Sequence, residues 1–179
     1  MYYLDTPITD TDADAIVVPV SLRGTTQPGS LQSQVIAALG DEYLEDYLGQ
    51  LKKGHLQPGK PSLYWHNDKR FPGVINFPVE NLTGREIWLS DIVRGLSAMF
   101  VGLKSEPIHT VAVPWLGREY SWDTLEWVLH RMEEIHGDEA KVVLWLYPPS
   151  DDEEDGIRCR VVDSDAQTNI VESAVGCGL

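Results

Sequence analysis

A loop rich in glycine and hydroxyl side chains lies between a predicted strand and a predicted helix. Residues 15–20 form a largely β-branched apolar run, residues 24–30 read Gly-Thr-Thr-Gln-Pro-Gly-Ser, and apolar residues at helical spacing begin at Leu31. The start of a helix exposes N–H groups that no carbonyl accepts, and the helix dipole adds partial positive charge there. Such a turn binds phosphate groups. The chemistry that this segment favours is therefore the capture of an anion.

Candidate ligand-binding residues lie in and beside this loop. Gly24, Pro28 and Gly29 are candidates to cradle a diphosphate, because glycine lets a ligand approach the backbone closely. The alternative is that they are turn residues, with Pro28 preparing the start of the helix. Ser21 and Ser30 are candidates to donate hydrogen bonds to a phosphate or a ribose. For Ser30, capping of the helix is the alternative.

Two acidic residues and one amide are candidates at other strand and helix ends. Glu80 follows a predicted strand and is a candidate general base, with a solvent-exposed loop residue as the alternative. Asp123 begins a predicted helix and is the second candidate catalytic residue, although acidic residues are common there because of the helix dipole. Asn76 either faces the ligand from the end of its strand or caps loose polar groups of that strand.

Strands and helices alternate along the chain, which predicts an α/β fold with a largely parallel sheet. The strands are continuously apolar, which is typical of strands covered on both faces, and the helices show apolar residues at helical spacing. The predicted strands are residues 15–20, 62–65, 73–78, 109–114 and 141–147, and the predicted helices are residues 31–39, 41–53, 89–103 and 123–136, the last ended by Gly137.

Composition limits the classes of partner. The chain has 179 residues, 42% hydrophobic residues and a formal net charge of −14, and this acidity disfavours general nucleic-acid binding and anionic membrane surfaces. Two cysteines, Cys159 and Cys177, form no disulfide framework, so a cytoplasmic location is expected. No histidine has a His, Cys or acidic residue at metal-ligand spacing in the sequence, so no metal site is expected. The sequence has no P-loop and no Rossmann glycine fingerprint, and no cofactor is expected.

The composition changes near residue 150. We expect one domain over residues 1–149, followed by an acidic turn at 151–155, a candidate strand at 157–162 and a polar C-terminal tail over 164–179. A charge run of this kind is usually a solvated turn or linker.

Four blocks of sequence occur in a characteristic order and span about two-thirds of the chain. They are Asp14-Ala15-Ile16-Val17, residues 53–60, Val74–Pro78 with Leu89–Leu96, and Val111–Gly117. These blocks resemble the macrodomain family, and within it the branch that contains antitoxins of DNA ADP-ribosyltransferase toxins. The resemblance implies a three-layer α/β/α fold with a mostly parallel mixed sheet. It also implies binding of ADP-ribose, which some members hydrolyse from protein or nucleic acid.

The chain departs from the family pattern at several site positions. Pro7 stands where an acidic residue often binds the adenine amino group, and Val18 and Ser21 stand where members usually have an Asn pair. Glu80 replaces the Lys that is implicated in catalysis in the antitoxin branch. The second phosphate loop, normally rich in glycine, has only Gly117.

Three residues of this second loop complete the candidate ligand-binding set. Gly117 keeps one glycine of the family's loop. Arg118 could compensate for lost loop amides by gripping a phosphate through two hydrogen bonds, with an exposed surface arginine as the alternative. Tyr120 could stack on adenine or pack against the sheet.

Three functions follow as hypotheses. The first is binding of ADP-ribose or a related NAD-derived nucleotide without hydrolysis. The second is an ADP-ribosyl glycohydrolase with a rearranged site, which the missing Lys weakens. The third is a non-catalytic interaction domain that has lost its ligand and docks on a basic protein partner through its acidic surface.

Overall fold

The computed structural model describes residues 1–66, 70–150 and 153. The chain divides into two compact units, Met1–Pro148 and Pro149–Leu179. In the second unit the Ser150 N–H donates to Glu153 Oε2 over 3.1 Å. The candidate strand at 157–162, most of the acidic turn, the tail and both cysteines lie outside the described residues.

Six strands of the first unit form one mixed sheet in the order β1-β6-β5-β2-β4-β3. All neighbouring strands are parallel except β3 and β4, which are antiparallel. The prediction of a mostly parallel mixed sheet is therefore confirmed. The strands are β1 (Tyr2–Tyr3), β2 (Ala15–Ser21), β3 (Ser62–Trp65), β4 (Gly73–Glu80), β5 (Thr110–Val113) and β6 (Val143–Leu146).

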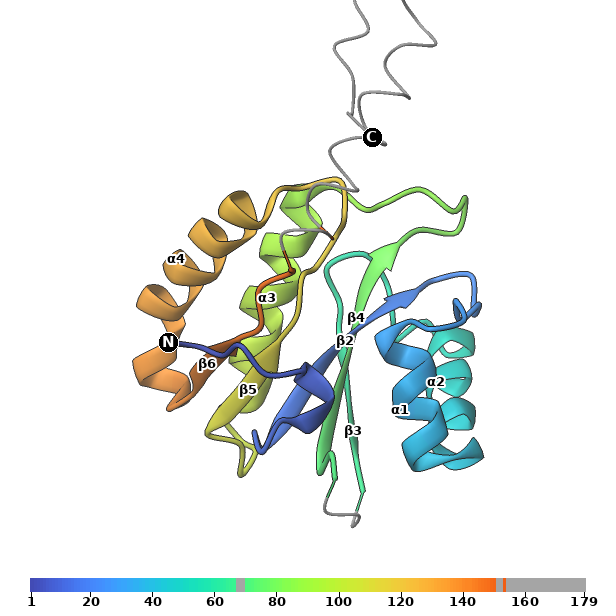
Figure 1. Cartoon of the computed structure of the whole chain (residues 1–179). Helices are drawn as coiled ribbons and strands as arrows, with labels where there is room; N and C mark the ends of the chain where they lie inside the picture. Colours follow the sequence, from blue (N-terminus) through green and yellow to red (C-terminus); the bar gives the residue numbers. More distant parts are fainter. Residues whose placement is uncertain (67–69, 151–152, 154–179) are drawn as a thin grey trace, which may run out of the picture. The chain divides into compact units, whose positions relative to one another are not determined.

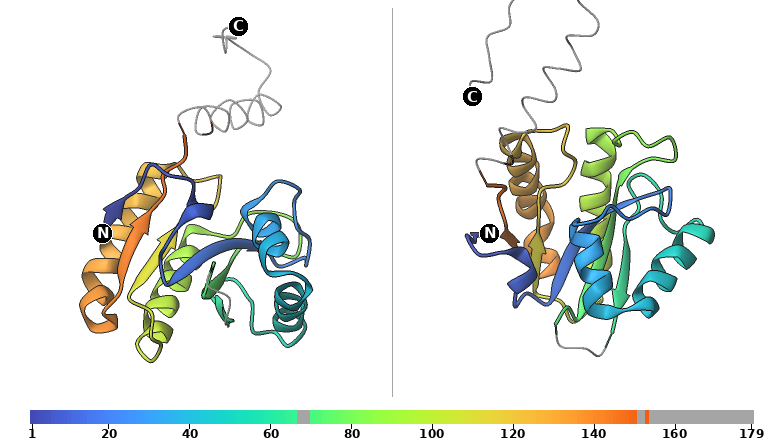
Figure 2. Two further views of the ribbon diagram at one scale, coloured as in Figure 1. Left: turned by 60° about the horizontal axis from the view of Figure 1, so that its bottom comes forward. Right: turned by 45° about the vertical axis from the view of Figure 1, so that its right-hand side comes forward.

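Helices cover both faces of this sheet, which confirms the three-layer arrangement (Figure 1). α1 (Leu31–Leu39) and α2 (Asp41–Lys52) lie on one face, and α3 (Leu89–Leu103) and α4 (Trp122–Ala140) on the other. The two views in Figure 2 show the same two pairs on opposite sides of the strands. A short 3-10 helix, Ile8–Asp10, begins directly after Pro7.

The alternating side chains of β2 serve two hydrophobic cores. Ala15 and Val17 pack with α3 and α4, whereas Ile16, Val18 and Val20 pack with α1 and α2. Both sets are buried, because each face of a central strand meets a helix layer. This explains why the sequence of β2 is continuously apolar and does not alternate.

Most predicted boundaries lie within one residue of those in the structure. β4 continues to Glu80, two residues beyond the predicted end. The prediction that Gly137 ends the last helix is wrong, because α4 continues to Ala140 and ends at Lys141, which has a left-handed φ of 57°. Gly137 is needed for close packing, since an added Cβ would lie 3.0 Å from Glu133 Cγ and 3.4 Å from the Val142 carbonyl oxygen.

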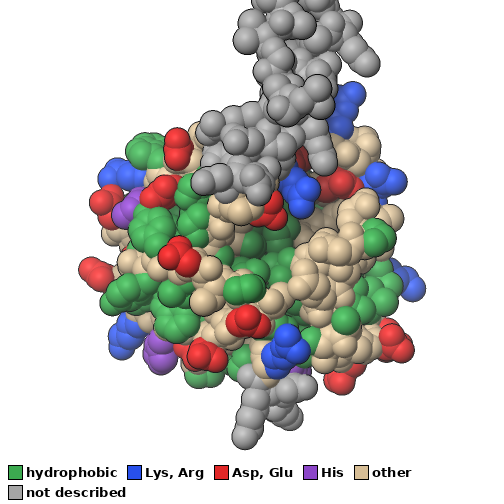
Figure 3. All heavy atoms as spheres, viewed as in Figure 1, with side chains coloured by type: hydrophobic (Ala, Val, Ile, Leu, Met, Phe, Trp, Pro, Cys, Tyr) green, Lys and Arg blue, Asp and Glu red, His purple; other side chains and the backbone are tan. Residues whose placement is uncertain are grey.

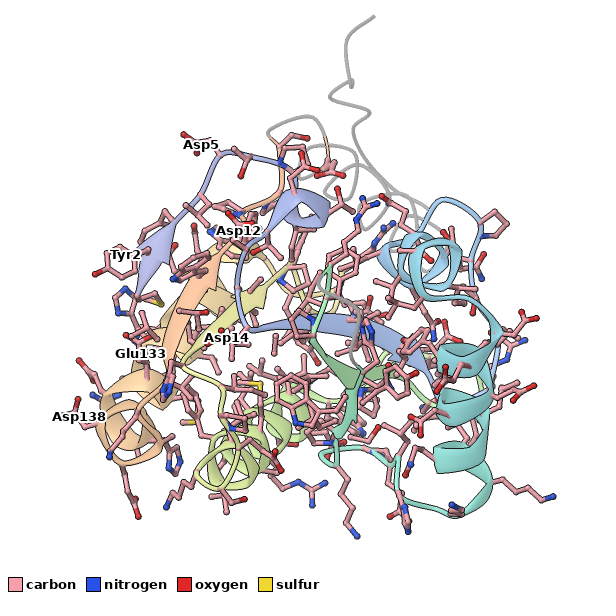
Figure 4. The ribbon with its side chains drawn as sticks, turned by 90° about the horizontal axis from the view of Figure 1, so that it is seen from below. Tyr2, Asp5, Asp12, Asp14, Glu133 and Asp138 are labelled. Atoms are coloured by element: carbon pink, nitrogen blue, oxygen red, sulfur yellow. The ribbon has the colours of Figure 1, made fainter. Side chains whose placement is uncertain are left out.

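Acidic side chains stabilise the end of the sheet where β2 and β5 begin (Figure 4). Asp14 Oδ2 accepts from the N–H groups of His109 and Thr110, at 2.7 and 3.0 Å. Glu133, on α4, accepts from the N–H of Leu144 over 2.9 Å. These carboxylates hold the backbone of neighbouring elements, so part of the chain's acidity is structural.

Acidic side chains are dispersed over the face shown in Figure 3, with Lys and Arg between them. No helix among the described residues is long and apolar enough to cross a membrane.

The topology brings three loops to one edge of the sheet. β2 is paired in parallel with β4 on one side and β5 on the other, so the carboxyl ends of all three strands lie together. The connections that leave β2 and β4 run to opposite faces of the sheet. Ligands of open α/β sheets bind at such a switch point.

The close contact between α3 and the sheet can be tested with two Gly→Ala substitutions in one helix. An added Cβ at Gly95 would lie 2.7 Å from Phe77 Cζ, whereas Gly102 has open space. We expect Gly95→Ala to lower the free energy of unfolding by about 1–3 kcal/mol through overpacking. Gly102→Ala should leave it unchanged or raise it by up to about 1 kcal/mol, because Ala favours the helix. Urea denaturation measures both, and equal effects would contradict the packing argument.

Candidate functional site

Three loops follow the carboxyl ends of β2, β4 and β5. We call residues 22–30 the first loop, residues 81–88 the middle loop and residues 114–121 the second loop. Every sequence-predicted site residue except Asn76 and Asp123 lies in these loops or at the strand ends that lead into them.

Half of the N–H groups of the first loop have no hydrogen-bond partner among the described residues. Ser30 caps α1, since its Oγ accepts from the Ser33 N–H over 3.2 Å, and its own N–H donates to the Gln27 carbonyl. The N–H groups of residues 25–27, Gly29 and Leu31 make no hydrogen bond to any residue that the structure describes. They surround the start of a nine-residue helix. The arrangement offers donors and a helix dipole to an anion.

The two glycines of this loop have left-handed backbone conformations, with φ of 74° at Gly24 and 77° at Gly29. An added Cβ at Gly24 would lie 3.3 Å from Leu48 Cδ2, so Gly24 packs against α2. Nothing lies within 4 Å of the corresponding position at Gly29. Pro28 is exposed beside it. Gly29 therefore leaves space next to the helix start, while Gly24 serves the turn.

Ser21 and Glu80 are brought together at the ends of β2 and β4. Ser21 Oγ donates to Glu80 Oε1 over 2.7 Å and accepts from the Arg23 N–H over 3.1 Å. The Arg23 guanidinium lies 3.9 Å from the same carboxylate oxygen. The Ser21 carbonyl accepts from the Tyr47 hydroxyl. Both groups of Ser21 are thus engaged with the protein itself.

Asn76 lies in the middle of β4 and not at its end. Its side chain is fully buried on the face covered by α1 and α2, and its Oδ1 accepts from the Tyr43 hydroxyl over 2.6 Å. Its Nδ2 has no hydrogen-bond partner among the described residues. Burial raises the pKa of the Tyr43 hydroxyl well above its usual range and that of Tyr47 to about 12. Both tyrosines therefore remain neutral donors near neutral pH.

The middle loop is a tight turn held by one side chain. Asn81 Oδ1 accepts from the Thr83 N–H at 2.9 Å, the Thr83 hydroxyl at 2.7 Å and the Arg85 N–H at 3.0 Å. Gly84 has a φ of 78°, and an added Cβ there would lie 2.6 Å from Arg23 Nη1. The turn therefore packs on the first loop and leads the chain back towards the second loop at Glu86.

The backbone of the second loop binds a carboxylate from the middle loop, that of Glu86. Glu86 Oε1 accepts from the Arg118 N–H over 2.6 Å, and Oε2 accepts from the Glu119 N–H over 2.8 Å. Gly117, with φ of 76°, has no room for a side chain beside Ile92 Cδ1 and Glu86 Oε2. Burial raises the pKa of the Glu86 carboxyl above its ordinary value of 4.5, although the two N–H donors act in the opposite direction. Two adjacent N–H groups thus hold a carboxylate as they would a phosphate.

The remaining predicted residues have separate roles. Arg118 is exposed, and only its N–H has a hydrogen-bond or ion-pair partner among the described residues. The hydroxyl of Tyr120 donates to the Ile87 carbonyl over 3.2 Å, and its ring packs against the core below α3 and α4. Burial raises the pKa of Tyr120. Asp123 is exposed in the first turn of α4, whose cap is Ser121.

Glu86 is the residue that sequence reasoning missed. Asn81 and Gly84 are turn-forming residues three positions apart, and they follow a strand directly. This signal predicts a tight reversal that returns the chain to the edge of the sheet. It does not specify which loop a carboxylate in the returning segment would contact.

The fold of this chain is similar to those of solved macrodomain structures. The chain is 24% identical to the macrodomain of Mycobacterium tuberculosis DarG, with a TM-score of 0.74, covering 83% of this chain and 97% of that one. It is 19% identical to the macrodomain of Thermus aquaticus DarG, with a TM-score of 0.69 and the same coverage. The chain has the macrodomain fold. The resemblance of the four sequence blocks is thereby confirmed at the level of fold.

A third similar structure is described as Thermosipho africanus DarTG in complex with ADP-ribose. The identity is 19% and the TM-score 0.69, over 83% of this chain and 41% of that chain. No protein-family model and no curated protein matches the sequence. In this chain, β2 contains Ala15–Val17 of the first block, and β5 with the second loop contains the Val111–Gly117 block.

The hydrogen bond between Tyr43 and Asn76 can be tested by Tyr→Phe substitution. Tyr43→Phe removes the hydroxyl that donates to Asn76 Oδ1. Because a buried acceptor is then left without this donor, we expect the free energy of unfolding to fall by about 1–3 kcal/mol. Tyr64→Phe is the matched control, because the ring of Tyr64 packs edge-on against Tyr43 and its hydroxyl has no hydrogen bond to a described residue. Chemical denaturation compares the two. An equal loss in both variants would contradict a specific contribution of the hydrogen bond between Tyr43 and Asn76.

Proposed function

We propose that this macrodomain binds ADP-ribose or a related NAD-derived nucleotide and does not hydrolyse it. The observation that carries the proposal is the set of free N–H groups at the start of α1, at the carboxyl end of the central strand β2. The structure of Thermosipho africanus DarTG, which has this fold, is described as a complex with ADP-ribose.

The first loop has the donors and the space that a diphosphate needs. The free N–H groups before and after residue 28 can donate to phosphate oxygens. Hydrogen bonds to a charged acceptor are shorter and stronger than hydrogen bonds between neutral groups. The open space at Gly29 lets the ligand reach the backbone, which a larger residue would prevent. The strand–loop–helix order is the same as in other phosphate sites of α/β proteins.

The proposal is limited to binding because of Glu80. The antitoxin branch has a Lys at this position, and here the charge is reversed. The Glu80 carboxylate accepts a hydrogen bond from Ser21 and lies near the Arg23 guanidinium. Its contacts are therefore with other residues of the protein. Asp123, the other catalytic candidate, is exposed on α4 and lies outside the three loops.

The wider expectations from the sequence stay predictions. They are a cytoplasmic location, a basic protein partner, the absence of general nucleic-acid binding and the division of the chain near residue 149.

The proposal is tested by calorimetry with ADP-ribose in the wild type and in two Gly→Glu variants. Gly29→Glu places a carboxylate beside the free N–H groups, and we expect affinity to fall by at least about tenfold, the equivalent of about 1.4 kcal/mol. Gly40→Glu is the matched control, because Gly40 has φ of 79° and open space like Gly29 but lies at the other end of α1. It should bind as the wild type does.

Two results would contradict the proposal. One is an absence of heat with the wild type up to millimolar ADP-ribose. The other is an equal loss of affinity in both variants, which would assign the effect of Gly29→Glu to backbone strain or net charge and not to the first loop.

A further inference from the structure

The second loop differs from the first because its N–H groups are already bound. One oxygen of the Glu86 carboxylate accepts from the Arg118 N–H and the other from the Glu119 N–H, at 2.6 and 2.8 Å. In the first loop the N–H groups of residues 25–27 and Gly29 have no hydrogen-bond partner in the part of the chain that the structure describes. One half of the candidate phosphate site is therefore open, and the other half is filled by the protein.

The geometry of this contact is that of an anion site. Two successive backbone N–H groups converge on one carboxylate, next to a glycine whose left-handed conformation orients them. Such concave sets of N–H groups bind phosphate and carboxylate alike. The contact is half-buried, and the added Cβ of any other residue at Gly117 would lie 3.4 Å from Glu86 Oε2.

We propose that the Glu86 carboxylate is an internal competitor that a phosphate group of the bound nucleotide replaces at the second loop. Glu86 is then the residue that sets how tightly the site holds its ligand and at which pH. This inference rests on the proposed function, since it concerns the same site.

Burial disfavours the charged form of Glu86. It is the largest cause of the raised pKa of this carboxyl, which the two N–H donors lower, so the charged form is less favoured there than in water. Rotation of the side chain towards solvent relieves this desolvation. The backbone of the middle loop need not move, because Asn81 and the bond from the Ile87 N–H to the Val79 carbonyl, 3.0 Å long, hold it independently of Glu86.

The charged and titratable groups around Glu86 come from two elements. Glu119 and Arg118, on the second loop, act on the carboxyl in opposite directions, Glu119 raising its pKa and Arg118 lowering it. Tyr120 lies on the same loop, and Asp91 lies in the first turn of α3; both Glu86 and Asp91 contribute to the raised pKa of Tyr120. Among these groups, Glu86 is the carboxyl whose protonation weakens the hydrogen bonds from the two N–H groups.

Calorimetry with ADP-ribose is the first test. In Glu86→Gln the side chain keeps its size but can accept from only one N–H and turns an NH₂ group towards the other, so we expect affinity to rise about tenfold. Glu45→Gln, an exposed position on α2, makes the same change in net charge and should leave affinity unchanged.

The pH dependence gives a second signature. As pH falls from about 8 to about 5, a larger fraction of Glu86 becomes protonated, while a diphosphate stays ionised. Wild-type affinity should therefore rise towards low pH, and the affinity of Glu86→Gln should change less over the same range. A wild type and variant with the same affinity and the same pH profile would overturn the inference and leave the proposed function standing.

NMR of the full chain separates the inference from the function. The amide signals of Arg118 and Glu119 should shift in Glu86→Gln and should titrate with pH in the wild type only. With inorganic pyrophosphate as a probe, these two signals should respond at lower concentration in the variant. If ADP-ribose gives no heat with either protein but pyrophosphate behaves as stated, the proposed function fails and the competitor role stands. If neither anion moves these signals in the variant, the inference is overturned.

Discussion

Parallel pairing of β2 with both β4 and β5 is the constraint on which the site depends. Because the three strands point in the same direction, the first, middle and second loops all begin at one edge of the sheet. The apolar sequence of β2 allows this, since its side chains fill two cores at once. A central strand with one polar face would have left one helix layer without a partner and the loops without a common edge.

The chain fills part of its own anion-binding edge with carboxylates. Glu80 is bound by Ser21 and Glu86 by two N–H groups of the second loop. Both belong to the segment that leaves β4, and its tight turn at Asn81 and Gly84 lies between them. Residues 80–86 thus contribute one carboxylate to Ser21, directly before the first loop, and one to the backbone of the second loop.

The sequence was sufficient for the fold and for the first loop, and insufficient for the contacts across the site. Helix and strand periods are local, so the bounds of α1, β3 and α3 follow from spacing alone, and the Ser30 cap follows from its position. Asn76 and Glu86 depend on pairing between distant segments. Asn76 meets Tyr43 of α2, and Glu86 meets residues 32 and 33 positions later. A strand of two residues, β1, is too short to show a period.

A chain with a net charge of −14 can still hold a phosphate, because the two effects act over different distances. Repulsion from dispersed surface carboxylates is screened beyond about 8 Å at physiological salt, whereas N–H contacts act at about 3 Å in a partly desolvated site. Glu86 adds a third, local effect, since a ligand must displace it to reach the second loop. In a ligand with two linked phosphates, one phosphate can bind the first loop without competition. The second phosphate is then held near the second loop, and its replacement of Glu86 is effectively intramolecular. The same arrangement disfavours a single free phosphate at the second loop, so it discriminates by ligand length as well as by charge.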